Sequence, residues 1–592
     1  MGAFFLVRHN ANPKASRTVS SIEKCLLRQE FGVPRAIDRP MYSLRIYKKR
    51  NISEDNYFSQ SQDNFAFSTG TFIYKESIGA EALRRFLEDF DIQNVNWSEV
   101  HGHFCVGVNI GNVLYLLTDR LGIYHVYCDS SKQVYSSSFL AVLESLDSAR
   151  MNTQSIYEYV FDGATYGNRT VFNEIDLVDQ HCMLRISDKV SLLPYKNGLV
   201  RRIEDDRNDR NVADDLAVLR HCFGILTKCF GSNISMGLSG GRDSRLMLAL
   251  LLEQGIQPQL YVYGKKDSVD VQVAMQIAKG EGFSIEHIDR SAFPRPNLSE
   301  FPATVERNFY AFDGYPQSGI FDNGSDLATR LQRSSAGQLV LNATAAEVFR
   351  LVFELADIRL TIPQVLRRCS TAFDPSSCTS TFDEKAYLST LADKNNVAGH
   401  VTHHRLGRNA IEALYVDIRC RYWGARTPTI NNRFGWAMTP FLDVKIVESA
   451  ASLPFKDRVY GRYLGRLIRE VSPALAKYPS AYGHNFQGEP TVRRKLSFMA
   501  MHLRKTYLPF INAYRAKLGV SKWLKRPFPF PLCSEYIGTA IDPAFPYLSQ
   551  FFHVARVVDP EHYARICTLE YLFEKYQSSL TTASKPLVDS GI

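Results

Sequence analysis

Six consecutive residues, Ser239-Gly240-Gly241-Arg242-Asp243-Ser244, combine side chains and backbone freedom suited to binding a phosphate chain. They lie between an apolar segment expected to be a buried strand, residues 234–238, and an apolar segment expected to be a helix, residues 243–253. Glycines let the backbone turn tightly and point successive N–H groups into one concavity, and the N-terminus of the following helix adds positive potential. Ser239 and Ser244 add hydroxyl donors, and Asp243 offers a carboxylate to a divalent cation. The pattern predicts a pyrophosphate-binding loop.

The same segment fits two other interpretations. Gly237-Leu238-Ser239-Gly240-Gly241 matches G-x-S-x-G, the nucleophile elbow of serine hydrolases, which also lies between a strand and a helix. That interpretation requires an acid and a histidine further along the chain, and it gives no reason for the continuation through Ser244. A plain glycine turn is the third interpretation, since a motif in its expected context is still a hypothesis.

The elements around the loop indicate an α/β region. Apolar runs predict a helix over 216–230 and strands over 234–238, 259–263 and 284–288, with helices over 243–253 and 269–279 between them. Strands alternating with helices at this spacing are typical of a doubly wound parallel sheet. Before residue 200 the sequence pattern differs, because short runs typical of β-strands occur at 71–74, 104–108 and 113–117. Residues 201–215 are charged and rich in turn formers, and the chain beyond about residue 400 reads as mostly helical. We therefore expect three parts, residues 1–205, 206–480 and 481–592.

Composition sets the class of protein. The 592 residues are 45% hydrophobic and 22% charged, which excludes collagen-like, coiled-coil and disordered chains. No apolar run approaches the ~18 residues of a membrane span. The start, residues 1–6, meets Arg8 too soon for a signal peptide. Eleven scattered cysteines without a CxxC pair indicate reduced thiols, so we expect a cytoplasmic protein.

With these residues in place, the chain resembles a known family. The segment SGGRDS after an apolar strand resembles the SGGxDS pyrophosphate loop of ATP pyrophosphatases, and specifically that of the asparagine synthetases. Downstream, residues 261–264 and Asp270 resemble the next strand of the family and the acidic residue near its nucleotide. Residues 440–454, which begin Pro-Phe-Leu-Asp and end Leu-Pro, resemble a further segment of the same family.

Upstream, four short segments resemble the class II glutamine amidotransferase domain that precedes the synthetase domain in this family. They are Gly70-Thr71, Gly102-His103-Phe104, Asp119 to Tyr124 and Tyr135 to Ser138. The resemblance implies an N-terminal nucleophile-type αββα domain. It is followed by a doubly wound, adenine nucleotide α-hydrolase-like domain with a helical C-terminal extension.

The resemblance also implies an activity, that of an ATP-dependent carbon–nitrogen ligase. Such an enzyme adenylates a small-molecule or sugar carboxylate, releases pyrophosphate and transfers the acyl group to ammonia or an amine, with Mg²⁺ assisting. The matching positions give Asp243 and Glu347 as metal ligands, Glu347, Arg462 and Arg466 as catalytic residues, and a nucleotide-binding set made of Ser239, Gly240, Gly241, Asp243, Ser244, Gly264 and Asp270. A non-catalytic nucleotide-binding or scaffold relative is the alternative from a different class.

Three departures from the family qualify these expectations. Glutamine hydrolysis in the family resembles N-terminal nucleophile chemistry on a cysteine, whereas position 2 is Gly2 and the nearest cysteine is Cys25, so we expect no glutaminase activity. The stretch 341–349 stands where the family has a glycine-rich acidic loop, and only Glu347 remains acidic in it. The lysine expected after residue 454 is missing, which leaves Arg462 and Arg466 as substitutes that present their charge differently.

Three further features of the sequence are a basic stretch, a group of histidines and a pair of tyrosines. Residues 493–526 hold ten Lys or Arg and no Asp or Glu, interleaved with apolar residues. This pattern indicates either a packed helix with a solvated basic face, or a peripheral contact with an anionic membrane or a lipid-linked substrate at its inner face. No nucleic-acid-reading motif accompanies the charge. His400, His403 and His404 lack the other ligands of a metal site, and Tyr157 and Tyr159 are expected in the core.

Overall fold

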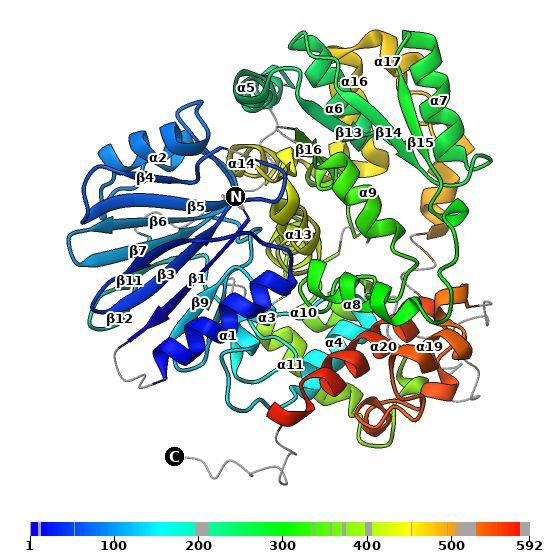
Figure 1. Cartoon of the computed structure of the whole chain (residues 1–592). Coiled ribbons are helices and arrows are strands. Elements are labelled where there is room, and N and C mark those ends of the chain that lie inside the picture. Colours follow the sequence, from blue (N-terminus) through cyan, green and yellow to red (C-terminus); the bar gives the residue numbers. More distant parts are fainter. Residues whose placement is uncertain are drawn as a thin grey trace.

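The computed structural model describes residues 2–9, 14–52, 54–195, 212–335, 338–353, 355, 358–369, 374–396, 405–451, 453–493, 495–501, 503, 507 and 528–580. These residues form three β-sheets, arranged with their helices as Figure 1 shows. Within the described part of the chain, no helix combines the length and the apolar character needed to cross a membrane.

Two antiparallel six-stranded sheets occupy the amino-terminal part of the chain, in blue and cyan in Figure 1. The first has the order β10-β8-β9-β1-β3-β2, with strands β1 (Ala3–Arg8), β2 (Arg35–Asp38), β3 (Tyr42–Tyr47), β8 (Tyr127–Asp129), β9 (Val134–Ser136) and β10 (Ile175–Leu177). The second has the order β12-β11-β7-β6-β5-β4, with strands β4 (Tyr57–Ser59), β5 (Asn64–Tyr74), β6 (Val100–Ile110), β7 (Val113–Thr118), β11 (Cys182–Ile186) and β12 (Val190–Pro194). The strands predicted at 71–74, 104–108 and 113–117 are confirmed within β5, β6 and β7.

A third, five-stranded sheet is entirely parallel and has the order β15-β14-β13-β16-β17. Its strands are β13 (Ile234–Gly237), β14 (Gln259–Tyr263), β15 (Ile285–Ile288), β16 (Leu339–Leu341) and β17 (Trp436–Met438). From β13 the chain runs outward to β15 and then returns to the other side of β13 to form β16 and β17. The strand order therefore reverses between β13 and β16, which is where open α/β sheets bind their ligands. The strands and helices predicted between 216 and 288 are confirmed to within a few residues.

Helices flank all three sheets. Before the parallel sheet they are α1 (Ala15–Arg28), α2 (Gly79–Glu88), α3 (Phe139–Leu143), α4 (Thr153–Asp162) and α5 (Val212–Phe230). Within and after it they are α6 (Asp243–Glu253), α7 (Val269–Glu281), α8 (Phe301–Ala311), α9 (Ser325–Arg333), α10 (Ile362–Cys369), α11 (Glu384–Asn396), α12 (Arg408–Leu414), α13 (Arg426–Phe434), α14 (Val444–Ala451), α15 (Phe455–Arg458), α16 (Arg462–Val471), α17 (Pro473–Lys477), α19 (Ser534–Ala540) and α20 (Pro560–Lys575).

The antiparallel sheets form the inner layers of a four-layer sandwich. Successive side chains of β1 point to opposite faces, as a strand requires. Phe4 points toward the second sheet, where its ring centroid lies 5.6 Å from that of Phe67 in β5, while Phe5 belongs to the core shared with α1. On the outer face of the second sheet, Phe86 of α2 packs edge-on against Phe72 of β5 at 5.3 Å. The layers are thus helix, sheet, sheet and helix, the αββα arrangement that the resemblance implied.

The carboxy-terminal helices pack on the amino-terminal half. α20 lies beside α4 (Figure 1), and Arg565 of α20 donates to the carbonyl oxygens of Val160 and Phe161 at 3.1 and 3.2 Å. Phe161 also packs against Phe552 with ring centroids 6.0 Å apart. The described residues after 528 therefore share a core with residues before 165. The expected division into three consecutive parts did not include this long-range contact.

Polar contacts join the second antiparallel sheet to the parallel sheet. Thr71 of β5 donates from its hydroxyl toward Asn432 and the carbonyl of Ala437, at 2.8 and 3.0 Å. One strand over, Nε2 of His103 accepts the N–H of Thr439 at 3.1 Å. All of these side chains are buried. The family-like segments around Gly70 and Gly102 therefore contribute to the junction between the two halves.

Candidate functional site

The predicted pyrophosphate loop connects β13 directly to α6. The N–H of Leu238 donates to the carbonyl of Tyr261 at 2.8 Å, which carries the parallel pairing one residue past β13. Ser239 Oγ then accepts the N–H of Gly241 at 3.2 Å and lies 3.1 Å from Ser244 Oγ, while Ser244 Oγ accepts the N–H of Ser239 at 3.0 Å. The two hydroxyls thus hold the loop in a tight turn over the N-terminus of α6, the arrangement that the sequence predicted.

Gly240 already contacts a carboxylate. Its N–H donates to Oδ1 of Asp270, from the first turn of α7, at 2.9 Å. Its carbonyl accepts the N–H of Ala481 at 2.9 Å, and a Cβ atom at this position would lie 3.0 Å from the Ala481 methyl group. The position therefore suits glycine, and its N–H points toward a site that holds an anion. Backbone N–H groups before a helix can donate to a phosphate as they do to a carboxylate, so this N–H has the direction that the predicted phosphate contact requires.

Two carboxylates from different strand ends meet near this loop. Asp243 follows β13, and Glu347 lies in the short 3₁₀ turn Ala346–Phe349 after β16. Burial, and next the charge of Glu347, raise the pKa of Asp243 to about 7. Oδ1 of Asp243 is buried without a hydrogen-bond partner. A pair of facing carboxylates, one with an orphaned oxygen, is a donor set that a hard divalent cation fits.

The loop after β16 holds Glu347 firmly in place. Its Oε2 accepts the N–H of Ala345 at 2.7 Å and the hydroxyl of Tyr415 at 2.9 Å, and its Oε1 lies 3.0 Å from Nη2 of Arg350. Ala345 has a φ of +76°, a left-handed conformation that an alanine rarely adopts. The departure from the family's glycine-rich sequence therefore leaves backbone strain at a position next to the site.

Arg350 is a site residue that the sequence did not single out. Burial tends to lower its pKa, but the charges of Asp243 and Glu347 raise it above its ordinary value. Its guanidinium thus pairs with Glu347 and is also stabilised by the charge of Asp243. The only sequence signal was its place three residues after Glu347, which in a helical turn puts the two side chains on one side.

A cavity of about 570 Å³ opens at this end of the parallel sheet. Five predicted residues line it together, namely Ser239, Asp243, Ser244, Asp270 and Glu347. The lining also includes Arg290, Arg330 and Arg333, which belong to none of the sequence motifs. Asp326 pairs with Arg290 at 2.6 Å and with Arg330 at 3.1 Å, and Arg333 lies over the rings of Tyr261 and Tyr263, each at 4.8 Å. The cavity is therefore lined by hydroxyls, carboxylates and guanidinium groups.

Five predicted residues do not line this cavity, namely Gly240 and Gly241 of the loop, Gly264, Arg462 and Arg466. Gly264 ends β14 with a φ of +132° and donates its N–H to the carbonyl of Ile288 at 3.1 Å, so it shapes the strand end. Arg462 and Arg466 line a separate cavity of about 170 Å³, where Arg462 pairs with Glu489 at 2.9 Å. Arg242, with its guanidinium stacked 4.1 Å over the ring of Tyr482, lines that second cavity as well. The sequence order around residue 462 was a poor guide to position because α16 begins only after a kink at Tyr460, whose φ is +59°.

The remaining predictions fall partly outside the described residues. His400, His403 and His404 lie outside them, as does most of 493–526. In the described part of that stretch, Leu496, Met499, Leu503 and Tyr507 are each more than half exposed, whereas Phe498 packs against Tyr460 at 4.8 Å. Tyr157 and Tyr159 are buried in an aromatic core, which confirms the expectation for them.

Comparisons with known proteins add little to this geometry. No protein-family model matches the chain, and no curated protein sequence matches it significantly. Among solved structures, it is similar to glutamine phosphoribosylpyrophosphate amidotransferase from B. subtilis complexed with ADP and GMP, with 11% identity and a TM-score of 0.22 over 48% of this chain and 65% of that one. A second match, described as the allosteric regulatory enzyme of purine biosynthesis, has 11% identity and a TM-score of 0.23 over 50% of this chain and 68% of that one.

This chain thus spans less than two thirds of the first matched structure. That structure is named an amidotransferase.

Proposed function

We propose that this protein is an ATP-dependent amide-forming ligase of the asparagine synthetase type. In the first step an oxygen of a substrate carboxylate attacks the α-phosphorus of ATP and pyrophosphate leaves. In the second step ammonia or an amine attacks the acyl-adenylate, and AMP leaves. Activation is needed because oxide is a poor leaving group whereas AMP is a good one.

The observation that carries the proposal is the loop of residues 239–244, in which a backbone N–H already donates to a carboxylate. The N–H of Gly240 donates to the Asp270 carboxylate at 2.9 Å, in a cavity also lined by Ser239 and Ser244. A phosphate group of ATP can take the same N–H, and the positive end of α6 then stabilises charge developing on the departing pyrophosphate. Asp270 would release Gly240 and remain at the mouth of the site.

The carboxylates of the cavity fit Mg²⁺. Asp243, with its orphaned Oδ1, and Glu347 would hold the ion together with phosphate oxygens, since Mg²⁺ prefers one or two carboxylates plus substrate phosphates. When bound, the ion would neutralise charge on the phosphates. Arg350, paired with Glu347 at 3.0 Å, keeps that carboxylate aimed into the cavity.

The amine is proposed to come from solution or from a second substrate. A side chain at position 2 has no room, because a Cβ on Gly2 would lie 2.5 Å from the carbonyl oxygen of Lys48 and 2.6 Å from the ring of Phe31. The carboxylate substrate is proposed to be a small molecule or a sugar acid, and the guanidinium groups of Arg290, Arg330 and Arg333 in the cavity lining favour an anion.

A non-catalytic nucleotide-binding relative is the second candidate. One observation favours it: both carboxylate oxygens of Glu347 already have partners within the protein, in Ala345, Tyr415 and Arg350. The serine hydrolase lacks such support. Among the described residues that line the cavity there is no histidine, and Ser239 Oγ is engaged with Ser244 and Gly241.

The test is exchange of labelled pyrophosphate into ATP, with Mg²⁺ and a panel of amino-acid, peptide and sugar carboxylates. Carboxylate-dependent exchange supports the ligase. ATP binding without exchange for any carboxylate supports the non-catalytic relative, and ester cleavage without ATP supports the hydrolase. A protein that neither binds ATP nor exchanges pyrophosphate contradicts both nucleotide-binding proposals.

A peripheral contact of residues 493–526 with an anionic surface remains a separate proposal. The exposed Leu496, Met499 and Leu503 suit insertion among lipids, with cations between them for the headgroups. Sedimentation with anionic and neutral vesicles, at low and moderate salt, tests it. The comparison is with a variant in which Arg493, Arg494, Lys495, Arg504 and Lys505 are neutral, and equal behaviour of the two proteins would contradict the contact.

A further inference from the structure

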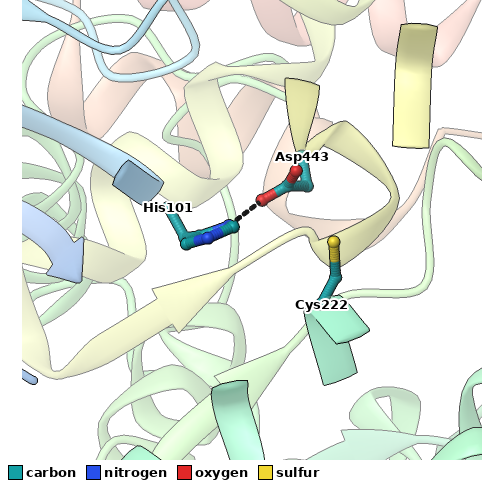
Figure 2. A group of neighbouring side chains, drawn as sticks. All are labelled: His101, Cys222 and Asp443. Atoms are coloured by element: carbon teal, nitrogen blue, oxygen red, sulfur yellow. Dashed lines mark hydrogen bonds and ion pairs between the residues drawn. The ribbon is translucent and has the colours of Figure 1, made fainter. Parts of the chain in front are cut away.

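Three buried side chains from distant parts of the sequence converge where the two halves meet. Figure 2 shows His101, from β6 of the second antiparallel sheet, directed toward Asp443, with Cys222 of α5 beside them. One nitrogen, one sulfur and one carboxylate oxygen lie within 4.8 Å of one another. The three residues are 5%, 4% and 5% exposed. In the part of the chain that the structure describes, this is the one group of at least three such ligands.

The group has the support that metal ligands usually have around them. Oδ2 of Asp443 lies 2.6 Å from Nδ1 of His101, and its other oxygen accepts the N–H of Lys445 at 3.0 Å. The N–H of Asp443 itself donates to the carbonyl of Pro440 at 2.9 Å. The carboxylate is therefore oriented by backbone contacts at the start of α14, and a second layer of hydrogen bonds of this kind tunes ligands in metal sites.

We propose that His101, Cys222 and Asp443 bind a zinc ion that fastens the αββα half to the parallel-sheet half. Thiolate, imidazole and carboxylate together are ligands that Zn²⁺ takes in proteins, whereas Mg²⁺ and Ca²⁺ prefer oxygen alone. The site lies outside the ATP cavity, since none of the three residues lines it. It rests on no step of the proposed ligase reaction.

The required movement is small. For tetrahedral zinc, ligand distances of about 2.0–2.3 Å place sulfur about 3.6 Å from an oxygen and nitrogen about 3.4 Å from it. The nitrogen–oxygen pair must open from 2.6 Å, and the widest pair must close from at most 4.8 Å. Both changes are within reach of side-chain rotations. The hydrogen bond between His101 and Asp443 is replaced by two bonds to the metal.

Charge and protons balance in this exchange. Burial, and next the charge of Asp443, raise the pKa of Cys222, so the thiol keeps its proton until a cation arrives. Zinc expels that proton to solvent, and on binding the imidazole of His101 carries its single proton on Nε2 rather than on Nδ1. Zn²⁺ with one thiolate and one carboxylate is neutral as a unit. The ammonium of Lys445, 3.2 Å from Nε2 of His221, therefore meets no net positive charge there.

A fourth ligand is close at hand. His221 precedes Cys222 on α5, and its ring centroid lies 6.1 Å from that of His101. It is more exposed than the other three, so it lies on the solvent side of the group. We assign it the fourth position, which it takes when its Nε2 gives up the ammonium of Lys445, 3.2 Å away, and this completes a site with two imidazoles, one thiolate and one carboxylate.

The first measurement is the zinc content of the full chain. Protein purified without chelator is dialysed against metal-free buffer and analysed by inductively coupled plasma mass spectrometry. We expect one zinc per chain in the wild type and in Cys229→Ser, a matched control two turns further along α5. Cys222→Ser and Asp443→Asn should bind zinc at least tenfold more weakly, the effect expected for a lost or neutralised ligand. His221→Ala should weaken binding less than either.

A second measurement keeps the proposal testable if Cys222→Ser folds poorly. Co²⁺ is added to metal-free wild type and to Asp443→Asn, in which an amide oxygen can still accept the N–H of Lys445. The wild type should show a thiolate-to-cobalt charge-transfer band that zinc abolishes, and the variant should not. Wild-type protein that neither retains zinc nor develops this band, or Cys222→Ser that holds zinc as tightly as the wild type, overturns the proposal and leaves a hydrogen-bonded cluster.

Discussion

Two aspartates of this protein, both removed from bulk water, show how differently its two regions treat a carboxylate. Asp313, at the junction with the antiparallel half, accepts hydrogen bonds from Ser138 Oγ at 2.6 Å and from the N–H of Phe139 at 2.7 Å, and it pairs with Arg433 at 3.1 Å. Burial opposes its charge, but Arg433 and these donors lower its pKa. Asp243, in the parallel half, has an orphaned oxygen and a pKa raised to about 7 by burial and by Glu347.

The difference separates a structural carboxylate from one suited to a ligand. A fully partnered charge stabilises the fold, whereas a charge with a like-charged neighbour and an unpartnered oxygen destabilises it until a cation binds. Packing differs between the two regions in the same sense, closed in the antiparallel half and open at the parallel sheet. Gly2, in the antiparallel half, lies against Lys48 and Phe31 with no space for a side chain, while the parallel sheet opens a cavity of about 570 Å³.

The largest expected effect is on activity, from Asp243→Asn. The uncharged amide of asparagine binds Mg²⁺ more weakly than the carboxylate does. The rate of pyrophosphate exchange should therefore fall by about 10³-fold or more. Asp267→Asn, in the exposed loop between β14 and α7, is the matched control and should keep wild-type exchange. Full exchange activity in Asp243→Asn would contradict the assignment of this residue.

The same variant has a predicted pH signature. The folded state of the wild type keeps a proton on Asp243 up to about pH 7, whereas the unfolded chain loses it near pH 4. The folded state therefore binds more protons between these values, and the free energy of unfolding falls as pH rises from about 4 to about 7. In Asp243→Asn the free energy of unfolding should no longer fall over this pH range. At pH 8 the variant should therefore unfold at a higher temperature than the wild type. Activity of the wild type should fall as pH drops below about 7.

The opposite result is expected for Asp313→Asn. Removing its charge leaves Arg433 buried without a full partner, at a cost of about 3–5 kcal/mol in the free energy of unfolding. Because the folded-state pKa of Asp313 is lowered, its contribution is present above the ordinary aspartate pKa and is lost as pH falls through the folded value. Urea unfolding of both variants at pH 4 and pH 8 measures the contrast. If Asp243→Asn lowered the free energy of unfolding and Asp313→Asn left it unchanged, the assignment of Asp313 as structural and of Asp243 as a ligand-binding carboxylate would be wrong.

Gly2→Ala tests the closed packing of the antiparallel half. The added methyl group would meet a carbonyl oxygen at 2.5 Å, so we expect a loss of about 1–3 kcal/mol in the free energy of unfolding. Gly32→Ala, at a glycine with open space around it and no positive φ, is the control and should change the free energy of unfolding little. Neither the wild type nor Gly2→Cys should release glutamate from glutamine, and glutaminase activity in either would show that this half is not merely structural.

The smallest expected effect is a gain. Ala345 has a φ of +76° beside the site, and glycine adopts that conformation without steric cost. Ala345→Gly should therefore raise the free energy of unfolding by about 0.5–1 kcal/mol, measured by thermal or urea unfolding. No gain would mean that the turn is supported well enough by Glu347 to hold either residue.

Local signals in the sequence determined the elements around the site. The helix over 243–253 and the strand over 259–263 were predicted to the residue, because a buried apolar run bounded by turn formers depends on near neighbours alone. The loop was predicted for the same reason, since its glycines, hydroxyls and helix start lie within six residues. The absence of a side chain at Gly2 is likewise a property of one position.

Tertiary structure decided which distant residues act together. Asp270 reaches Gly240, Glu347 and Arg350 reach Asp243, and Arg462 enters a different cavity because a kink at Tyr460 redirects the chain. His101, Cys222 and Asp443 carry no shared motif, yet they meet at the junction of the two halves. Contacts between residues more than a hundred positions apart depend on how whole sheets and helices pack. Spacing along a single chain does not encode them in any local pattern, so only the folded structure brings them together.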